Sequence, residues 1–282
     1  MGRVRFPRLP KSRKGFGSPT QRRWLAALAV VVLATVGVWL LLRALPEAVD
    51  ATWARIMQTG ILRVCTDPSW PPFESVDHPT GQTEGLDIDL AQLLAVRLAP
   101  GVHAEIVTVG FDGLYDALLA GRCDAILSAL PYEPTRTQDV TYSMAYFNAG
   151  LVLVTHQGTS DIAGLADLTG RVVSVEWGFV PDGDRRQRLF LQKLGLRRYD
   201  ATGDALRALQ SGEVEATLVD RISALAYLHH CQQVQITGEP ITDLNYVIPV
   251  RPDSFRLLAE INRVLLEMRQ DGTLENLQEK WF

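Results

Sequence analysis

The sequence predicts an α/β protein with two similar lobes, joined by two strands and preceded by one transmembrane helix. Three observations lead to this prediction. Residues 24–42 form an apolar run without a charge, and from Ile61 onward short apolar runs alternate with amphipathic stretches. A helix-to-strand unit then occurs twice, at 117–128 and at 208–219. The 282 residues are enough for two compact domains beyond the N-terminal segment.

The N-terminal segment is first basic and then apolar. Residues 1–23 carry eight Lys and Arg and no acid, and the nineteen residues of 24–42 include neither charge nor proline. Such a run is long enough to cross a bilayer, and its basic flank places the tail in the cytoplasm and the rest of the chain outside. We therefore expect a cytoplasmic tail at 1–23, an anchor at 24–42 and a tether at 43–60. A cleaved signal peptide is the alternative, because residues 49–51 (Val-Asp-Ala) could be a cleavage site.

The elements after Ile61 follow an α/β pattern. Strands are predicted for "ILRVCTD" (61–67) and "AEIVTV" (104–109), and a helix for "DIDLAQLLAVRL" (87–98), whose leucines fall on one face. The repeated unit, "ALLAGRCDAILS" and "ALQSGEVEATLV", contains a helix end, a glycine, an acid and an apolar strand. That order is typical of a helix that ends and leads into a parallel strand. One copy in each half predicts two lobes.

Two further apolar strands could connect the lobes. "YFNAGLVLVTH" (146–156) could carry the chain across, and "LNYVIPV" (244–250) could carry it back, which would make a two-strand hinge. We therefore expect lobe 1 to contain residues 61–152 and 247–282, and lobe 2 to contain residues 153–246. The last segment, from Asp253 to Phe282, has the apolar spacing of a helix.

Composition and motifs argue against several functions. The net charge of −4 with a basic tail leaves an acidic body, which is unsuited to nucleic acid. The chain has no G-x-S-x-G, P-loop, dinucleotide or H-E-x-x-H motif, and its five histidines lack metal-ligand spacing. Cys65, Cys123 and Cys231 lack it too, and their odd number leaves at least one thiol unpaired. We expect no cofactor and no metal.

Five segments occur in the order and spacing of one protein family: "LRVCTDPSWPPFE", "GLDIDLAQLLAVRL", "FDGLYDALLAGRCDAILSALPYEPTR", "EATLVDRISALAYL" and "MRQDGTLENLQEKWF". Together they resemble the family 3 extracellular solute-binding proteins, which are the amino-acid receptors of ABC importers. The resemblance covers about residues 60–282. It implies a type II periplasmic-binding-protein fold, whose two lobes close on a zwitterionic amino acid, and an ABC permease in the membrane as partner.

The resemblance implies one charged ligand contact from each lobe. Arg136 stands where the family's arginine binds the ligand carboxylate, for which a guanidinium offers two parallel hydrogen bonds. A surface ion pair, for example with Asp139, is the alternative. Asp220, at the end of a predicted strand, stands where the family's acid binds the ammonium group. Its alternative role is the N-cap of the helix that starts near Ile222.

Aromatic residues are implied to enclose the ligand side chain. Trp70 and Phe111 stand at those places, although Phe111 could be ordinary core and Trp70 could pack against the neighbouring prolines. Asp67 could contact the ligand side chain or cap its own Asp-Pro turn. The family resemblance also suggests a disulfide between Cys65 and Cys123, which the sequence alone leaves open.

Two departures from the family concern the carboxylate site. Pro131 replaces a threonine or serine and offers neither hydroxyl nor N–H. In the second lobe "EWGFVPD" keeps Gly178 but places Phe179 and Val180 where the family has hydroxyls. The pocket must therefore either recover these hydrogen bonds elsewhere, with Ser128 or the backbone around Gly178 as candidates, or bind a ligand whose anionic end is smaller, differently placed or absent. The alternative is that Pro131 only stiffens the turn before Arg136.

These observations predict a membrane-anchored solute receptor of an ABC importer, with its binding domain on the periplasmic or extracellular side. Its expected ligand is an amino acid or a related small carboxylate, and we expect no catalytic activity. One alternative is a dehydratase-like enzyme on the same scaffold, with Glu133 or Glu176 as the acid. The other is a ligand sensor or assembly partner.

Overall fold

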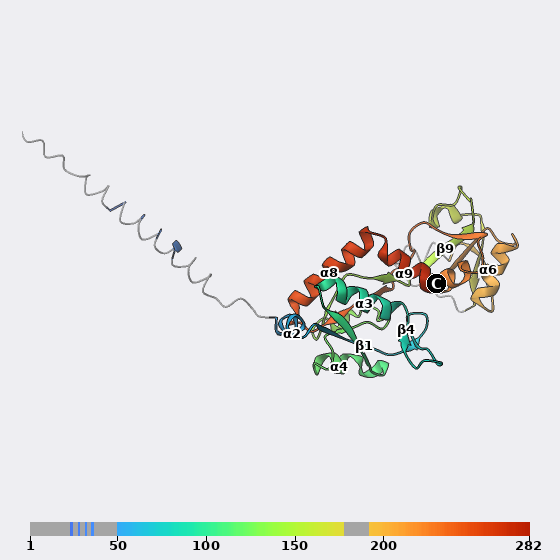
Figure 1. Cartoon of the computed structure of the whole chain (residues 1–282). Coiled ribbons are helices and arrows are strands. Elements are labelled where there is room, and N and C mark those ends of the chain that lie inside the picture. The colour runs from blue at the N-terminus through green and yellow to red at the C-terminus, as the bar shows by residue number, and fades with distance from the viewer. Residues whose placement is uncertain (1–22, 25–27, 29–31, 33–34, 37–49, 178–191) are drawn as a thin grey trace, which may run out of the picture. The chain divides into compact units, whose positions relative to one another are not determined.

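The computed structural model describes residues 23–24, 28, 32, 35–36, 50–177 and 192–282. The chain divides into two units, residues 1–49 and 50–282 (Figure 1). In the first unit the few described residues are helical. The predicted anchor at 24–42 lies mostly outside the described residues, and among those described no helix is both long and apolar enough to span a membrane.

The second unit begins with a helix where the sequence predicts the end of a tether. Helix α2 (Ala51–Thr59) starts at the N-cap Asp50 and ends at Gly60, whose φ of 71° is left-handed. The helix is held by contacts to distant residues, such as the 2.7 Å hydrogen bond between the hydroxyls of Thr52 and Ser254. Residues 50–60 are therefore part of the folded unit, and only 43–49, outside the described residues, are left for a tether.

The first sheet has five strands in the order β5-β1-β6-β15-β7. β1 lies parallel to β5 and β6, whereas β15 is antiparallel to β6 and β7. The strands predicted at 61–67 and 104–109 are confirmed to within a residue. The bounds are β1 (Ile61–Thr66), β5 (His103–Thr108), β6 (Ala125–Ile126), β7 (Thr141–Tyr142) and β15 (Pro249–Val250).

The second sheet has the order β11-β10-β12-β9-β13. β10 is parallel to β11 and β12, and β9 is antiparallel to β12 and β13. In each sheet the fourth strand is antiparallel to its neighbours and lies at the end of one of the two segments predicted to connect the lobes. This shared arrangement confirms two similar α/β lobes. The bounds are β9 (Leu151–His156), β10 (Val172–Glu176), β11 (Gly195–Tyr199), β12 (Ala216–Asp220) and β13 (Val234–Thr237).

A two-stranded ladder connects the sheets. β8 (Phe147–Asn148) pairs antiparallel with β14 (Asn245–Tyr246), within the two segments predicted as crossings. Pro131 extends this ladder through a bridge to Tyr246. The bridging hydrogen bonds come from its neighbours, so the missing N–H of the proline costs this pairing nothing.

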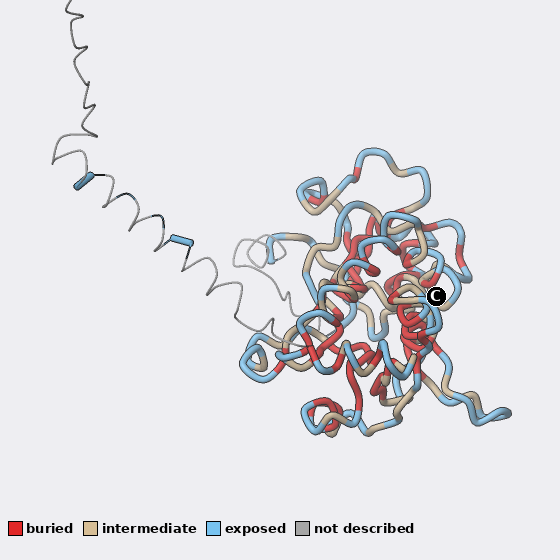
Figure 2. The backbone as a smooth tube through the Cα atoms, turned by 60° about the vertical axis from the view of Figure 1, so that its left-hand side comes forward, coloured by how far each residue is buried: buried red, intermediate tan, exposed pale blue. Residues whose placement is uncertain are grey.

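Helices cover both faces of the first sheet. α3, α8 and α9 share one apolar cluster with Leu62 and Val64 of β1, while α4 packs with Cys65 on the opposite face. Figure 1 shows α3 and α8 on one side of β1 and α4 on the other, and in Figure 2 the buried stretches of the backbone gather in the interior of the second unit. The tail predicted as helical forms two helices, separated at Gly272 with φ 79°. The helices are α3 (Leu86–Leu98), α4 (Leu114–Leu119), α6 (Thr202–Gln210), α7 (Arg221–Leu228), α8 (Phe255–Gln270) and α9 (Thr273–Trp281).

Short elements complete the described part of the fold. A three-stranded sheet lies between β1 and α3 in the sequence, and three 3-10 turns lie in loops. Their bounds are β2 (Ser69–Trp70), β3 (Glu74–Val76), β4 (Thr83–Glu84), η1 (Phe111–Gly113), η2 (Pro134–Arg136) and η3 (Leu165–Leu168).

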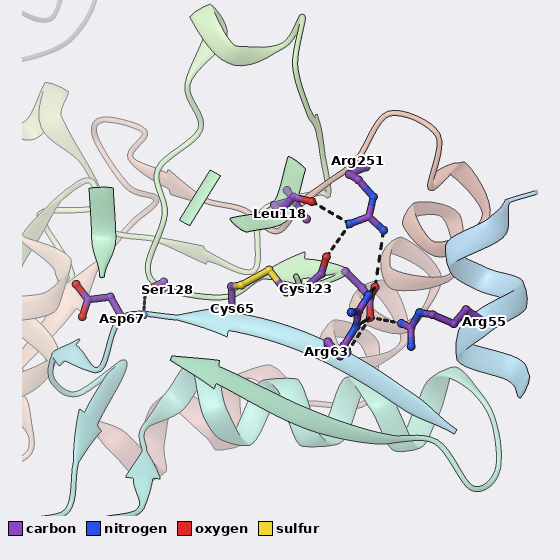
Figure 3. The surroundings of a disulfide bond; sticks show 9 residues. Arg55, Arg63, Cys65, Asp67, Leu118, Cys123, Ser128 and Arg251 are labelled. Atoms are coloured by element: carbon purple, nitrogen blue, oxygen red, sulfur yellow. Dashed lines mark hydrogen bonds and ion pairs between the residues drawn. A yellow bond between two sulfur atoms is a disulfide. The ribbon is translucent and has the colours of Figure 1, made fainter. Parts of the chain in front are cut away.

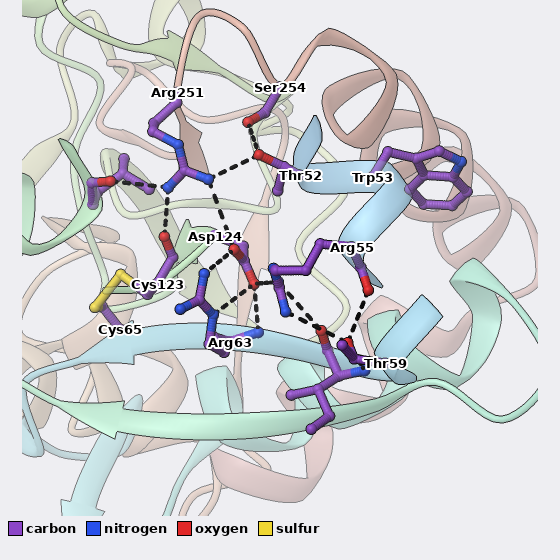
Figure 4. Close-up of polar contacts among 12 residues, drawn as sticks. Thr52, Trp53, Arg55, Thr59, Arg63, Cys65, Cys123, Asp124, Arg251 and Ser254 are labelled. Atoms are coloured by element: carbon purple, nitrogen blue, oxygen red, sulfur yellow. Dashed lines mark hydrogen bonds and ion pairs between the residues drawn. A yellow bond between two sulfur atoms is a disulfide. The ribbon is translucent and has the colours of Figure 1, made fainter. Parts of the chain in front are cut away.

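A disulfide and a buried ion cluster fix β1 against the segment before β6. Cys65 and Cys123 are bonded, with Cα atoms 5.7 Å apart, which settles the pairing that the sequence leaves open (Figure 3). The adjacent Asp124 is fully buried and accepts hydrogen bonds from Arg55 of α2 and from Arg63 of β1 (Figure 4). These contacts join α2, β1 and β6 at one end of the sheet.

Candidate functional site

The opposite end of the first sheet holds a cavity of about 320 Å³. On three sides the cavity is lined by residues that come after the carboxyl ends of the parallel strands β1, β5 and β6. Open α/β sheets bind their ligands at such ends. A fourth wall, Tyr246, comes from the connecting ladder. The lining residues are Asp67, Ser69, Trp70, Glu74, Phe111, Ser128, Ala129 and Tyr246.

Asp67 directly follows β1 and is held on two sides. Its backbone N–H donates to Ser128 Oγ at 2.9 Å (Figure 3), and its Oδ2 accepts from the Phe111 N–H at 3.0 Å. The carboxylate therefore caps the turn that begins at Phe111, a role that differs from both predicted ones. Oδ1 has no hydrogen-bond partner among the described residues, so a ligand contact through it stays a prediction.

Trp70 and Phe111 form the exposed apolar part of the cavity. Their exposed fractions are 55% and 53%, which are high for aromatic side chains. The alternative that Phe111 is ordinary core is therefore wrong. The structure brings the two predicted aromatic residues to one cavity, as a flat side-chain pocket requires.

Ser128 is buried, and its hydroxyl is fully used within the protein. It donates to Glu74 Oε1 at 2.9 Å and accepts from the Asp67 N–H. In this arrangement its proton is not available to an anion, which weakens the expectation that Ser128 replaces the hydrogen bonds lost at Pro131. Its role in the structure is to connect two acids that line the cavity.

Glu74 is a site residue that the sequence patterns do not predict. It lies in β3, is 1% exposed and lines the cavity beside Asp67. Burial is the largest cause that raises the pKa of Glu74, to about 10, and the neighbouring Asp87 is the next. The only sequence signal is an acid within an otherwise apolar stretch, between Phe73 and Val76.

The close approach of β3 to the start of α3 depends on Gly85. This residue has φ 140°, and a Cβ atom on it would lie 2.0 Å from the Phe73 carbonyl oxygen. The Asp87 N–H donates to that same oxygen at 2.9 Å. Glycine therefore lets the two segments meet and brings Asp87 next to Glu74.

Arg136 does not line this cavity. Its Nε donates to Glu133 Oε2 at 3.2 Å, and its guanidinium carbon lies 4.2 Å from the centroid of the Tyr115 ring. The expected alternative partner, Asp139, is not the one found. Within the described residues the two Nη atoms have no partner, and the side chain is 44% exposed. Carboxylate binding by Arg136 stays a prediction.

Asp220 ends β12 and begins α7. Its Oδ1 accepts from the Ser223 N–H at 2.8 Å, which is the N-cap arrangement given above as the alternative. Asp220 does not line the 320 Å³ cavity. The cap uses one oxygen, so the structure leaves the other without a partner among the described residues, and ammonium binding stays a prediction.

The remaining predicted position, Gly178, lies outside the described residues, as do Phe179 and Val180. The last described residue before them, Trp177, is 63% exposed. Among the described residues no group of three or more His, Cys, Asp or Glu could hold a metal ion.

Comparisons with known proteins give the same fold and one family. The sequence model of the bacterial extracellular solute-binding proteins, family 3, matches residues 62–282. The L-cystine-binding protein TcyJ of Escherichia coli is 29% identical over 230 residues, covering 81% of this chain and 85% of that protein. The ABC transporter arginine-binding protein 1 of Escherichia coli is 26% identical over 222 residues, covering 76% and 87%.

Two solved structures share the two-lobed architecture. The L-cystine solute receptor of Neisseria gonorrhoeae, in its unliganded open conformation, has a TM-score of 0.67 and 25% identity, covering 82% of this chain and 96% of that one. An ancestral cyclohexadienyl dehydratase has a TM-score of 0.68 and 27% identity, covering 80% and 94%. The curated relatives given above are binding proteins, so the comparisons favour binding over catalysis.

Proposed function

Since this chain belongs to the bacterial extracellular solute-binding proteins, family 3, we propose that it captures an amino acid or a related small carboxylate for an ABC importer. The observation that carries the proposal is the cavity at the carboxyl end of the first sheet, where Trp70 and Phe111 stand beside Asp67. Relatives that bind cystine and arginine support an amino-acid ligand. The protein itself is a binding protein and not an enzyme.

We assign the cavity to the ligand side chain. Its exposed aromatic faces suit apolar, planar or cationic groups. The charged residues that line it are both acids, and burial raises the pKa of Glu74 and so favours its neutral form, which leaves Asp67 as the acid that would meet a positive group. A side chain with a single positive charge would fit this arrangement best.

The two charged ends of the ligand are assigned to different lobes. Arg136 would bind the carboxylate with its free Nη atoms, and Asp220 would bind the ammonium group with its free carboxylate oxygen. A ligand that satisfies both charges only when the lobes are closed shifts the population toward the closed state. This gives closure a physical cause.

Calorimetry on the full chain in detergent tests this proposal with a panel of L-amino acids that includes L-arginine and L-cystine. Arg136→Ala should weaken binding by about 2–5 kcal/mol, since it removes one partner of a charge pair. Asp220→Asn keeps the helix cap, because asparagine is an equally good N-cap, and removes only the charge. It should weaken binding of amino acids more than of their deaminated analogues.

Arg122→Ala is the matched control, because Arg122 is an exposed arginine of the same lobe. Unchanged affinity in Arg136→Ala would remove the carboxylate contact from the proposal. Absence of binding to every amino acid in the panel, together with turnover of a cyclic carboxylic acid, would favour the dehydratase-like alternative.

We further propose that residues 24–42 anchor the receptor in the cell membrane, with residues 1–23 in the cytoplasm and the binding domain outside. The apolar run and its basic flank support this topology. An anchored receptor stays at high effective concentration near an ABC permease in the same membrane. The folded unit starts at Asp50, so any tether is limited to residues 43–49.

A further inference from the structure

Two carboxylic acids interact in the protein interior, and one of them, Glu74, lines the proposed ligand cavity. Glu74 is 1% exposed and Asp87 is fully buried. Glu74 Oε1 accepts from the Ser128 hydroxyl, and Asp87 Oδ2 accepts from the Ala129 N–H at 2.7 Å and from the Tyr146 hydroxyl at 2.9 Å. Among the described ion pairs, none includes either acid.

The other two carboxylate oxygens have no partner. Glu74 Oε2 and Asp87 Oδ1 are both buried without a hydrogen bond to any described residue. An ionised carboxylate can only accept hydrogen bonds, so two ionised acids would leave both oxygens unsatisfied and would also repel each other. A single proton between them removes both problems.

We propose that Glu74 and Asp87 share one proton at neutral pH and that this pair positions the floor of the ligand cavity. Glu74 is the protonated partner, because Asp87 already accepts two hydrogen bonds that stabilise its charge. The two acids then form one unit with a single negative charge. The shared proton is independent of any ligand, whereas the positioning role rests on the proposed function.

The unit holds three groups that line the cavity. Asp87 fixes the N–H of Ala129, whose φ of 44° is left-handed and costly for a residue with a Cβ atom. Glu74 fixes the Ser128 hydroxyl, which in turn receives the Asp67 N–H. Loss of the proton from Glu74 would disturb this series of hydrogen bonds at its buried end.

The unit also reaches the ladder between the lobes. Tyr146, which donates to Asp87, directly precedes β8, and its own N–H donates to the Tyr246 carbonyl at 3.0 Å. Tyr246 lines the cavity as well. The pair is therefore connected to the cavity and to the segment that must bend when the lobes close.

The titratable groups that face the pair are all acidic. They are Asp67 at the end of β1, Tyr146 before β8 and Tyr246 of β14. Burial raises the pKa of Asp87 to about 6, in addition to the rise of Glu74 to about 10. Between these values the folded protein keeps one proton that the unfolded chain has released, so stability falls as pH rises.

Infrared spectroscopy and thermal unfolding of the full chain test the shared proton without a ligand. At neutral pH the wild type should show the carbonyl band of one buried protonated carboxylic acid, and Glu74→Gln should lack it. The melting temperature of the wild type should fall between about pH 6 and pH 9. That fall should be much smaller in Glu74→Gln, whose amide donates to Asp87 Oδ1 without titrating.

Glu84→Gln is the matched control, because Glu84 is an exposed acid of the same small sheet, and it should keep both the band and the pH dependence. Should Glu74→Gln fail to fold, Asp87→Asn offers the same test, since its amide can donate to Glu74 Oε2. The shared proton would be overturned by a wild type without the band at neutral pH, or by a Glu74→Gln or Asp87→Asn variant that retains it.

Binding of L-arginine tests the positioning role. Glu74→Ala removes the acceptor of Ser128 and should weaken binding about tenfold or more, and Glu74→Gln should recover most of that loss. An alanine variant that binds as tightly as Glu84→Gln would overturn the role. If the wild type does not bind L-arginine or any other amino acid, the proposed function fails while the infrared result still decides the shared proton.

Discussion

Replacing Asp50, the first residue of the folded unit, should destabilise that unit. Asp50 is 6% exposed, and its carboxylate starts two helices that are distant in the sequence. Oδ1 accepts from the Trp53 N–H at 2.8 Å in α2, and Oδ2 accepts from the N–H groups of Arg256 and Leu257 at 2.7 and 3.0 Å in α8. One side chain therefore accepts hydrogen bonds from three backbone N–H groups that have no acceptor within their own helices.

The magnitude follows from the hydrogen bonds that Asp50→Ala removes. Loss of one N-cap typically costs about 1 kcal/mol, and a buried donor left without its charged acceptor costs about 1–3 kcal/mol. Two helix starts are affected, and the Leu257 N–H is buried, so we expect a loss of about 3 kcal/mol. Asp50→Asn should lose less, because its single oxygen can still cap one of the two helices.

Urea unfolding of the full chain in detergent measures this loss. Asp253→Ala is the matched control, because Asp253 is 79% exposed and lies 3.9 Å from its ion-pair partner Arg251. It should stay within about 0.5 kcal/mol of the wild type. If Asp50→Ala is no less stable than Asp253→Ala, then α2 does not contribute to the folded unit in the way its contacts indicate.

Two further predictions concern the N-terminus and the disulfide. The mature protein should retain residues 1–49 and stay with membranes after a high-salt wash; a soluble form that begins at Thr52 would show a signal peptide instead, and it would also lack the cap from Asp50. The Cys65–Cys123 bond closes a separation of 58 residues, so Cys123→Ser should lower the free energy of unfolding by about 4 kcal/mol. Cys231→Ser is its control because Cys231 is free, and equal stability of the two variants would contradict the prediction.

Much of the fold could be predicted from periodicity alone. The leucines of 87–98 predict a helix, and Leu90, Leu94 and Leu98 are buried while Leu93 is half-buried. The glycine and acid of the repeated unit precede parallel strands in both lobes. Such local patterns are reliable because each element must bury one face, whichever element covers it.

Contacts that depend on register could not be predicted in this way. Whether Cys65 and Cys123 come within bonding distance depends on how β1 and β6 align, and the structure aligns Cys65 with Ile126. The folding of residues 50–60 depends on partners about 200 positions away, such as Ser254. A nine-residue helix would be marginal by itself, so its own sequence gives little sign that it forms.

The different roles of the three acids at the site also could not be predicted from the sequence. Asp67, Asp87 and Glu74 are all acids near predicted strands or helix starts, and in the sequence they look alike. Their environments separate them: Asp67 caps a turn and borders the cavity, Asp87 accepts two hydrogen bonds at one oxygen only, and Glu74 is buried beside it. Because a buried carboxyl group without a counter-charge favours its neutral form, Glu74 is best used as a hydrogen-bond donor. The proposed shared proton makes the charge that the cavity offers to a ligand smaller than the number of its acids implies.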